Sequence, residues 1–167
     1  MVKPSFKLGA MPSTGLLIMV VSLGALAFAL TMQYGFGVVP CQLCMWQRAP
    51  FVGAAFFALI ASVARPYGNH TRWLLGLCAL LFFANTGLAI FHSGVERHWW
   101  EFHSSCTGSV LDHLSVEALR QQLLGTPVVR CDEISWTLLG LSMANWNIFF
   151  SLALALFASK VASTKAA

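Results

Sequence analysis

Charged residues are scarce in this sequence. Of its 167 residues, 10 are Lys or Arg and 6 are Asp or Glu, so that only 10% carry a formal charge. Soluble domains carry about 25% charged residues, and this composition therefore argues against a soluble protein. The chain also lacks repeats, low-complexity tracts and linkers that would separate domains. We expect a single domain over residues 1–167, which is an ordinary domain length.

Long apolar runs take the place of the missing charge. The chain is 57% hydrophobic, and its mean hydropathy is +0.72. A helix that crosses the hydrocarbon core of a bilayer, about 30 Å thick, needs about 20 mostly apolar residues. Four segments meet that requirement, at about residues 14–34, 45–64, 73–92 and 143–161. The sequence therefore predicts an all-α membrane protein with four spans.

The first apolar run has an alternative interpretation as a secretory signal. Lys3 and Lys7 precede it, and residues 27–29, Ala-Phe-Ala, resemble a cleavage site. The run is long for a signal peptide, however, and continues through Leu30 and Met32. Its removal would also leave an odd number of spans, so we expect it to be the first span.

Basic residues predict the orientation of the four spans, because Lys and Arg near the ends of spans favour the cytoplasmic side. Six of the ten fall on one side: Lys3, Lys7, Arg65, Arg72, Lys160 and Lys165. All six acidic residues fall on the other side, in the long loop between the third and fourth spans. We therefore expect both termini in the cytoplasm. The net charge of +4 has a membrane explanation, and no nucleic-acid partner is expected.

The cysteines follow the same division. Cys41 and Cys44 lie at the outer end of the second span, and Cys106 and Cys131 lie in the long outer loop. These four face the side of the membrane where disulfides form and persist. Cys78 stands alone in the third span, where we expect a small buried hydrophobic residue.

The Cys-x-x-Cys motif of Cys41 and Cys44 has three interpretations. A structural disulfide would close so short a loop that it would constrain little of the unfolded chain. A structural zinc site favours two close pairs of ligands, and Cys106 and Cys131 are far apart in the sequence. Redox exchange suits a pair at a helix start, because backbone amides and nearby cations lower a thiol pKa. The spacing favours redox exchange, while the other two interpretations stay open.

Arg48 is a candidate for the same site. It follows Cys44 by one helical turn, so the two side chains share a helix face. An arginine there can stabilise a Cys44 thiolate, although arginines at the end of a span also extend to the lipid headgroups. Pro50 lacks an amide hydrogen, and we expect it to kink the second span just below the thiols.

Three polar residues of the third span need partners. His92 is predicted to end this span at about the level of Arg48. There it either donates a hydrogen bond to a ligand or is an ordinary interfacial residue. Asn85 and Thr86 lie inside the span, where we expect them to bond to each other or to a neighbouring helix.

Four blocks of sequence together form a recognisable pattern. They are Pro40-Cys41-Gln42-Leu43-Cys44 with Arg48, then residues 92–96 with Trp99 and Trp100, then Cys106, and finally Cys131-Asp132 with residues 136–143. The pattern resembles the disulfide bond formation protein B (DsbB) family, bacterial inner-membrane thiol:quinone oxidoreductases. The Cys-x-x-Cys alone is unspecific, whereas two outer cysteine pairs on four spans are more specific. With the spans, the resemblance covers nearly the whole chain.

The resemblance implies a fold, a route for electrons and a location. The fold is a four-helix transmembrane bundle with periplasmic loops at about residues 35–44 and 94–142. The route carries two electrons from a reduced periplasmic thioredoxin-fold oxidase, DsbA, to a membrane quinone, ubiquinone or menaquinone, as is known for the bacterial periplasm. The location is the inner membrane, with the active cysteines on the periplasmic side.

The resemblance also implies roles for individual residues. Cys106 would form the mixed disulfide with the partner protein, and Cys131 would pass the oxidation state on by exchange with Cys41. Cys44 would face the quinone as a thiolate. The quinone-binding residues that it implies are Arg48 and His92, and it implies no metal ligand.

Two rival functions compete with this one. A membrane metal- or haem-binding protein would use His92 and the cysteines, but the sequence lacks paired histidines on facing spans. A non-catalytic membrane scaffold would use the outer disulfide to hold a receptor loop. That second rival leaves the thiols at the bilayer edge unexplained.

Overall fold

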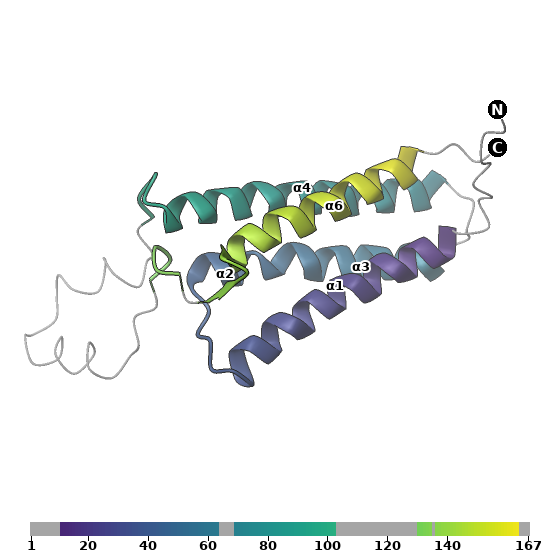
Figure 1. Cartoon of the computed structure of the whole chain (residues 1–167). Coiled ribbons are helices and arrows are strands. Elements are labelled where there is room, and N and C mark those ends of the chain that lie inside the picture. Colours follow the sequence, from purple (N-terminus) through teal and green to yellow (C-terminus); the bar gives the residue numbers. More distant parts are fainter. Residues whose placement is uncertain (1–10, 64–68, 103–129, 135, 164–167) are drawn as a thin grey trace, which may run out of the picture.

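Four long helical segments form a bundle in the computed structural model, which describes residues 11–63, 69–102, 130–134 and 136–163 (Figure 1). The segments that are long and apolar enough to cross a membrane are Thr14–Tyr34, Gln42–Val63, Asn69–Glu96 and Met143–Ser163. The chain is therefore a multi-pass helical membrane protein, and the predicted fold class is confirmed. Cys106 and most of the predicted outer loop lie outside the described residues.

The order of the elements places the thiol motif at one end of the bundle. Helix α1 is Met11–Tyr34, and the second span consists of α2, Gln42–Trp46, and α3, Arg48–Val63. Helix α4 is Asn69–Glu96, and α6 is Met143–Ser163. The start of α1 and the end of α6 lie together at the end opposite to α2 (Figure 1).

Helix α4 is longer than the sequence predicted at both of its ends. It begins at Asn69 and continues through Glu96, so that His92 lies inside the helix and does not end it. The last turn is polar, but it is buried against other elements: Ser93 is 6% exposed, and its hydroxyl donates to Asn145 on α6. Because tertiary contacts hold this turn, hydrophobicity alone ended the predicted span too early.

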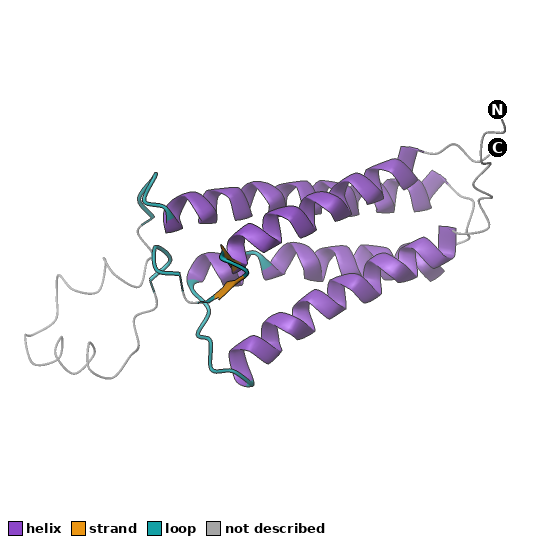
Figure 2. Ribbon diagram, in the orientation of Figure 1, coloured by secondary structure: helices purple, strands orange, loops and turns teal. Residues whose placement is uncertain are grey.

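The helices pack as α1 on α3, α3 on α4 and α4 on α6 (Figure 2). Small side chains allow close approach, as is usual between membrane helices. A Cβ atom added to Gly15 on α1 would lie 2.9 Å from the carbonyl oxygen of Ala58 on α3. Among the described residues, α1 and α6 share no extensive interface.

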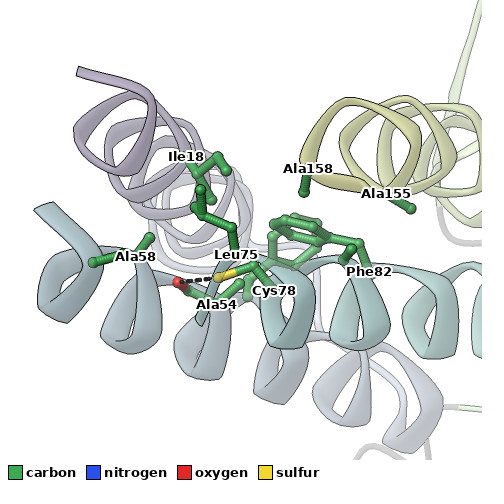
Figure 3. Close-up of a cluster of buried hydrophobic side chains, with 11 residues drawn as sticks. Ile18, Ala54, Ala58, Leu75, Cys78, Phe82, Ala155 and Ala158 are labelled. Carbon is green, nitrogen blue, oxygen red and sulfur yellow. Dashed lines mark hydrogen bonds between the residues drawn. The ribbon is translucent and has the colours of Figure 1, made fainter. Parts of the chain in front are cut away.

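The centre of the bundle is a cluster of buried apolar side chains from all four spans (Figure 3). Phe82 is its largest fully buried side chain, and the cluster also holds several alanines, among them Ala155 and Ala158 on α6. Cys78 belongs to this cluster, and its thiol donates to the carbonyl oxygen of Ala54 at 3.5 Å. This position agrees with the expectation of a small buried residue away from the other thiols.

The second span is interrupted at Gln47, between α2 and α3. Pro50 has no amide hydrogen to donate to the carbonyl four residues earlier, which belongs to Trp46, the last residue of α2. The interruption therefore lies where Pro50 was predicted to kink the span. It turns Gln47 inward, where only 7% of this residue is exposed.

A short hairpin precedes α6. Strands β1, Thr137–Leu138, and β2, Leu141–Ser142, pair antiparallel. Leu139 and Gly140 between them both have positive φ, which is the turn that fits the twist of a two-residue hairpin. The indole of Trp146 on α6 donates to the carbonyl oxygen of Leu138 and holds the hairpin against the helix.

Candidate functional site

The thiols of Cys41 and Cys44 form a hydrogen-bonded pair at the start of α2. Cys41 is the N-cap residue of α2, and its backbone is extended, with φ −73° and ψ 171°. Its thiol donates to Cys44 Sγ at 3.2 Å, and the backbone N–H of Cys44 donates back to Cys41 Sγ at 3.4 Å. The helix start thus holds the two sulfurs close enough for exchange chemistry. Cys41 is only 5% exposed.

Cys131 lies beside this pair. It is 6% exposed and belongs to one buried cluster with Cys41, Leu43 and Val95. Its sulfur interacts with the Cys41 side chain and with the backbone amides of Leu43 and Gln42 at the start of α2. The structure therefore brings together three of the four predicted active cysteines. The fourth, Cys106, lies outside the described residues.

Two of these thiols, Cys41 and Cys131, lie outside the membrane-spanning helices and have raised pKa values. The hydrogen bond to Cys44, followed by burial, raises the pKa of Cys41 to about 12. Burial raises the pKa of Cys131 to about 11. Next to Cys131, the guanidinium of Arg130 lowers the pKa of the Asp132 carboxyl, so that an ion pair flanks this thiol.

His92 reaches the thiols from α4. It is 3% exposed, and its Nε2 lies 3.5 Å from Cys41 Sγ and 3.9 Å from a carboxylate oxygen of Glu96. Its Nδ1 lies 2.9 Å from the side-chain nitrogen of Gln47. His92 is therefore buried among polar groups of the protein.

Sequence reasoning missed Gln47 and Glu96. The carboxylate of Glu96 accepts a hydrogen bond from the Ser142 hydroxyl at 2.5 Å, next to its contact with His92. The one-turn spacing of His92 and Glu96 was a signal available in the sequence. Gln47 offered none beyond its place between Cys44 and Pro50, since its partner Asn147 comes from the far end of the chain.

Asn85 and Thr86 bond in two different ways. The side chain of Asn85 donates to Ser151 on α6 at 2.8 Å, as expected for a bond to a neighbouring helix. Thr86 instead donates to the carbonyl oxygen of Phe82 within its own helix. The alternative in which the two residues satisfy each other is therefore wrong.

Arg48 lies at the start of α3, beyond the interruption that separates it from Cys44. The hydrogen bond described for its guanidinium goes to Oε1 of Gln33 on α1, at 2.7 Å. The break at Gln47 ends the regular helix on which the one-turn relationship to Cys44 was based. Arg48 and Cys44 nevertheless line the same cavity.

That cavity has a volume of about 530 Å³, within the usual range for small-molecule sites. Its walls are mainly apolar and come from α1 and α6, as in the case of Phe28 and Phe150. Its polar lining includes Cys44, Arg48 and His92. The arrangement suits a ligand with an apolar body and a polar head that meets the thiols.

The same donors could also hold a metal ion. The sulfurs of Cys41 and Cys44 and a ring nitrogen of His92 lie within 4.8 Å of one another. They are ligand types that zinc accepts, but a structural zinc site takes four ligands.

Comparison with known proteins identifies close relatives. The family model described as "Disulfide bond formation protein DsbB" matches residues 12–161. A disulfide bond formation protein B from Xylella fastidiosa (strain 9a5c) is 39% identical over 139 residues, which cover 80% of this chain and 79% of that protein. One from Xanthomonas oryzae pv. oryzae (strain MAFF 311018) is 35% identical over 146 residues, covering 81% and 80%.

Proposed function

We propose, on the premise that this chain belongs to the disulfide bond formation protein DsbB family, that it passes electrons from a periplasmic protein dithiol to a membrane quinone. Family membership makes the chain a membrane protein of disulfide bond formation, and it does not favour the metal- or haem-binding alternative. The proposal adds the electron acceptor, the partner and the side of the membrane.

The observation that carries the proposal is a thiol pair that lines a mainly apolar cavity between membrane helices. A quinone has a polar head and an apolar tail, and it dissolves in lipid. A soluble partner protein cannot enter lipid. The enzyme therefore needs one thiol pair at the edge of the membrane, a second pair in water, and exchange between the two.

The proposed exchange uses the four cysteines in order. A partner thiolate attacks Cys106 of a Cys106–Cys131 disulfide, and the freed Cys131 attacks Cys41 of the Cys41–Cys44 disulfide. The freed Cys44 then holds the charge. The second partner thiol attacks the mixed disulfide and releases the partner as a disulfide, which frees Cys106. Cys106 then attacks Cys131, so that the Cys106–Cys131 bond reforms, the Cys131–Cys41 bond breaks and Cys41 is released as a thiol. The burial of Cys131 beside Cys41 supports the middle step.

The electrons and protons balance in the last step. The Cys41–Cys44 dithiol becomes a disulfide again, and two electrons and two protons reduce the quinone to a quinol. Overall, a partner dithiol and a quinone become a partner disulfide and a quinol. Thiolate attack drives each exchange, so the rates depend on thiolate fraction and leaving-group pKa.

Arg48 and His92 are the proposed quinone-binding residues. Both line the cavity, where the Arg48 guanidinium can donate to a quinone carbonyl oxygen and the His92 ring lies beside the thiols that the quinone must reach. The quinone is ubiquinone or menaquinone, whose heads both carry such oxygens.

The proposed location is the bacterial inner membrane, with both termini in the cytoplasm and the thiols on the periplasmic side. The start of α1 and the end of α6 lie at one end of the bundle, with Lys160 in the last turn of α6 (Figure 1). Cys41 and Cys44 lie at the other end. The partner on that side is a thioredoxin-fold thiol oxidase similar to DsbA.

The test mixes the detergent-purified protein with a reduced thioredoxin-fold oxidase and soluble ubiquinone or menaquinone analogues, and it follows quinone absorbance. We expect turnover that requires both Cys44 and Cys106, measured with Cys44→Ser and Cys106→Ala. Cys78→Ala is the matched control, since this thiol lies in the bundle core. Folded protein that reduces neither analogue would contradict the proposal, as would full turnover in Cys44→Ser.

A further inference from the structure

A row of polar side chains, all buried except the half-buried Asn147, leads from the thiols into the bundle, and the proposed exchange steps do not account for it. It runs through His92, Gln47, Asn147, Ser151 and Asn85, which come from α4, α6 and the interruption after α2. Asn85 and Ser151 are fully buried. Polar groups at such depth in a membrane protein are costly and usually functional.

The far end of this row fixes the direction of its hydrogen bonds. The amide nitrogen of Asn85 donates to Ser151 Oγ at 2.8 Å and to Asn147 Oδ1 at 3.3 Å. The Ser151 hydroxyl also donates to Asn147 Oδ1, at 2.9 Å. Asn147 therefore accepts two bonds on its oxygen, and its amide nitrogen is left to donate in the other direction.

The row continues from Asn147 through Gln47 to the imidazole of His92. Asn147 Nδ2 donates to Gln47 Oε1 at 2.6 Å, so that Gln47 Nε2 faces His92 Nδ1 at 2.9 Å. An amide N–H can only donate, so His92 Nδ1 must offer its lone pair. The neutral ring then carries its hydrogen on Nε2.

The row of hydrogen bonds ends on a sulfur atom. His92 Nε2 lies 3.5 Å from Cys41 Sγ, and the Cys41 thiol donates to Cys44 Sγ at 3.2 Å. Every donor in the row therefore points the same way, and Cys44 Sγ is the last acceptor. Hydrogen bonds in such chains polarise one another, and bonds donated to a sulfur favour its charged form.

We propose that Gln47 is a positioning residue of the thiol site. Oriented by Asn147, its side-chain amide holds His92 in the Nε2–H tautomer, so that the row of donors ends on the Cys44 sulfur. Gln47 acts through His92 and is not bonded to either sulfur. The inference rests on the proposed function only for its effect on turnover, because the tautomer can be measured without quinone or partner.

The first test is nitrogen-15 NMR of the reduced, full-length protein labelled at histidine, at neutral pH, with the His92 signal assigned by its loss in His92→Gln. We expect a ring with hydrogen on Nε2 and a lone pair on Nδ1. In Gln47→Glu, which keeps the side-chain shape, the carboxylate can only accept, so Nδ1 should carry a hydrogen. Hydrogen on Nδ1 in the wild type, or no hydrogen there in Gln47→Glu, would overturn the proposal.

A second variant tests the orienting role of Asn147. Asn147→Leu removes the donor that fixes the Gln47 amide, so we expect the Nδ1–H tautomer to appear alongside the Nε2–H tautomer. Thr86→Val is the matched control, because it also changes a buried polar side chain of the bundle. The Thr86 hydroxyl donates to the carbonyl oxygen of Phe82 within its own helix and is not part of the row. An unchanged His92 signal in Asn147→Leu, or the same change in Thr86→Val, would contradict this role.

Turnover separates positioning from a merely structural effect. In Asn147→Leu we expect kcat to fall in proportion to the fraction of His92 in the Nδ1–H tautomer, while Thr86→Val keeps its kcat. A fall in kcat without a change of tautomer would contradict the positioning role. Wild-type protein that reduces no quinone would contradict the proposed function, while the NMR result would still decide the role of Gln47.

Discussion

Nη1 of Arg48 donates a 2.7 Å hydrogen bond to Oε1 of Gln33, so that α1 and α3 are tied together at the cavity. The guanidinium lines the cavity that holds the thiols, and its fork retains further N–H donors beyond the one that Gln33 accepts. Gln33 thus orients a cation whose remaining N–H donors could bind a ligand oxygen in the proposed quinone site.

The first prediction concerns this pair. Arg48→Met keeps an unbranched apolar side chain but removes the donors. A hydrogen bond to a charged group contributes about 1.5–3 kcal/mol, so we expect kcat/KM for the quinone analogue to fall by about tenfold or more. The single-turnover reaction of the oxidised protein with the partner dithiol should be unchanged, as followed by rapid acid quenching and thiol counting.

Gln33→Leu is the companion variant. It keeps the cation but removes the acceptor that orients it, so we expect a smaller loss in kcat/KM for quinone than in Arg48→Met. An equal loss in partner reaction and quinone reduction would instead mean that Arg48 supports the fold of the whole site.

The second prediction concerns pH. The folded protein raises the pKa of Cys41 to about 12 and of Cys131 to about 11, from an ordinary value of 9.0. The folded state therefore keeps its protons when the unfolded chain loses them, and stability falls as pH rises. The thiols stabilise the reduced fold fully below pH 9, and this contribution should be lost between pH 9 and about 12.

Thermal unfolding in detergent measures this effect. We expect the melting temperature of the reduced protein to fall more steeply above pH 9 than that of the oxidised protein, whose disulfides have no protons to lose. Cys131→Ser should reduce the slope of the reduced form. Equal slopes for the reduced and oxidised proteins would refute the assignment of these raised pKa values.

The third prediction concerns Cys78, which lies in the core of the bundle, away from the thiol site. It is fully buried, and its thiol donates to Ala54. Cys78→Ala removes one buried heavy atom, so we expect a loss of about 0.5–1.5 kcal/mol in stability, as for other single-group deletions in a core. Turnover should stay at the wild-type level, and a large fall in kcat at unchanged stability would show that Cys78 takes part in the exchange.

The sequence was sufficient for the features that depend on local chemistry. Apolar length located the four spans, and the missing amide of Pro50 located the interruption of the second. The end of α4 was placed too early because Ser93 and Glu96 are polar, and only their bonds to Asn145 and Ser142 explain why the helix continues.

The interior of the site depends on contacts that local patterns do not contain. Gln47 and Asn147 are 100 positions apart, and they meet only because α6 packs against α4 beside the interruption. Arg48 illustrates the same limit. Its regular spacing from Cys44 suggested direct contact, but the break at Gln47 and the acceptor on α1 gave its guanidinium another partner.

The last prediction concerns the packing of Trp100 against the end of α4. The indole of Trp100 stacks on Phe91 with 5.7 Å between ring centroids, and its Nε1 donates to the Phe91 carbonyl oxygen at 2.8 Å. A Cβ atom on Gly94 would overlap this indole, which is held at both its face and its nitrogen. Gly94→Ala should therefore displace Trp100 and cost about 1–3 kcal/mol of stability, as overpacking does.

Gly87→Ala is the matched control on the same helix, since a Cβ atom there meets nothing within 4 Å. Alanine is the better helix former by about 1 kcal/mol, so this variant should be neutral or slightly stabilising. Thermal unfolding and tryptophan fluorescence measure both effects, with a changed emission expected only in Gly94→Ala.

Because Val95, the residue after Gly94, packs against Cys41 and Cys131, Gly94→Ala should also slow the exchange between the thiol pairs. Equal stability of the two variants would show that Trp100 is not fixed over Gly94.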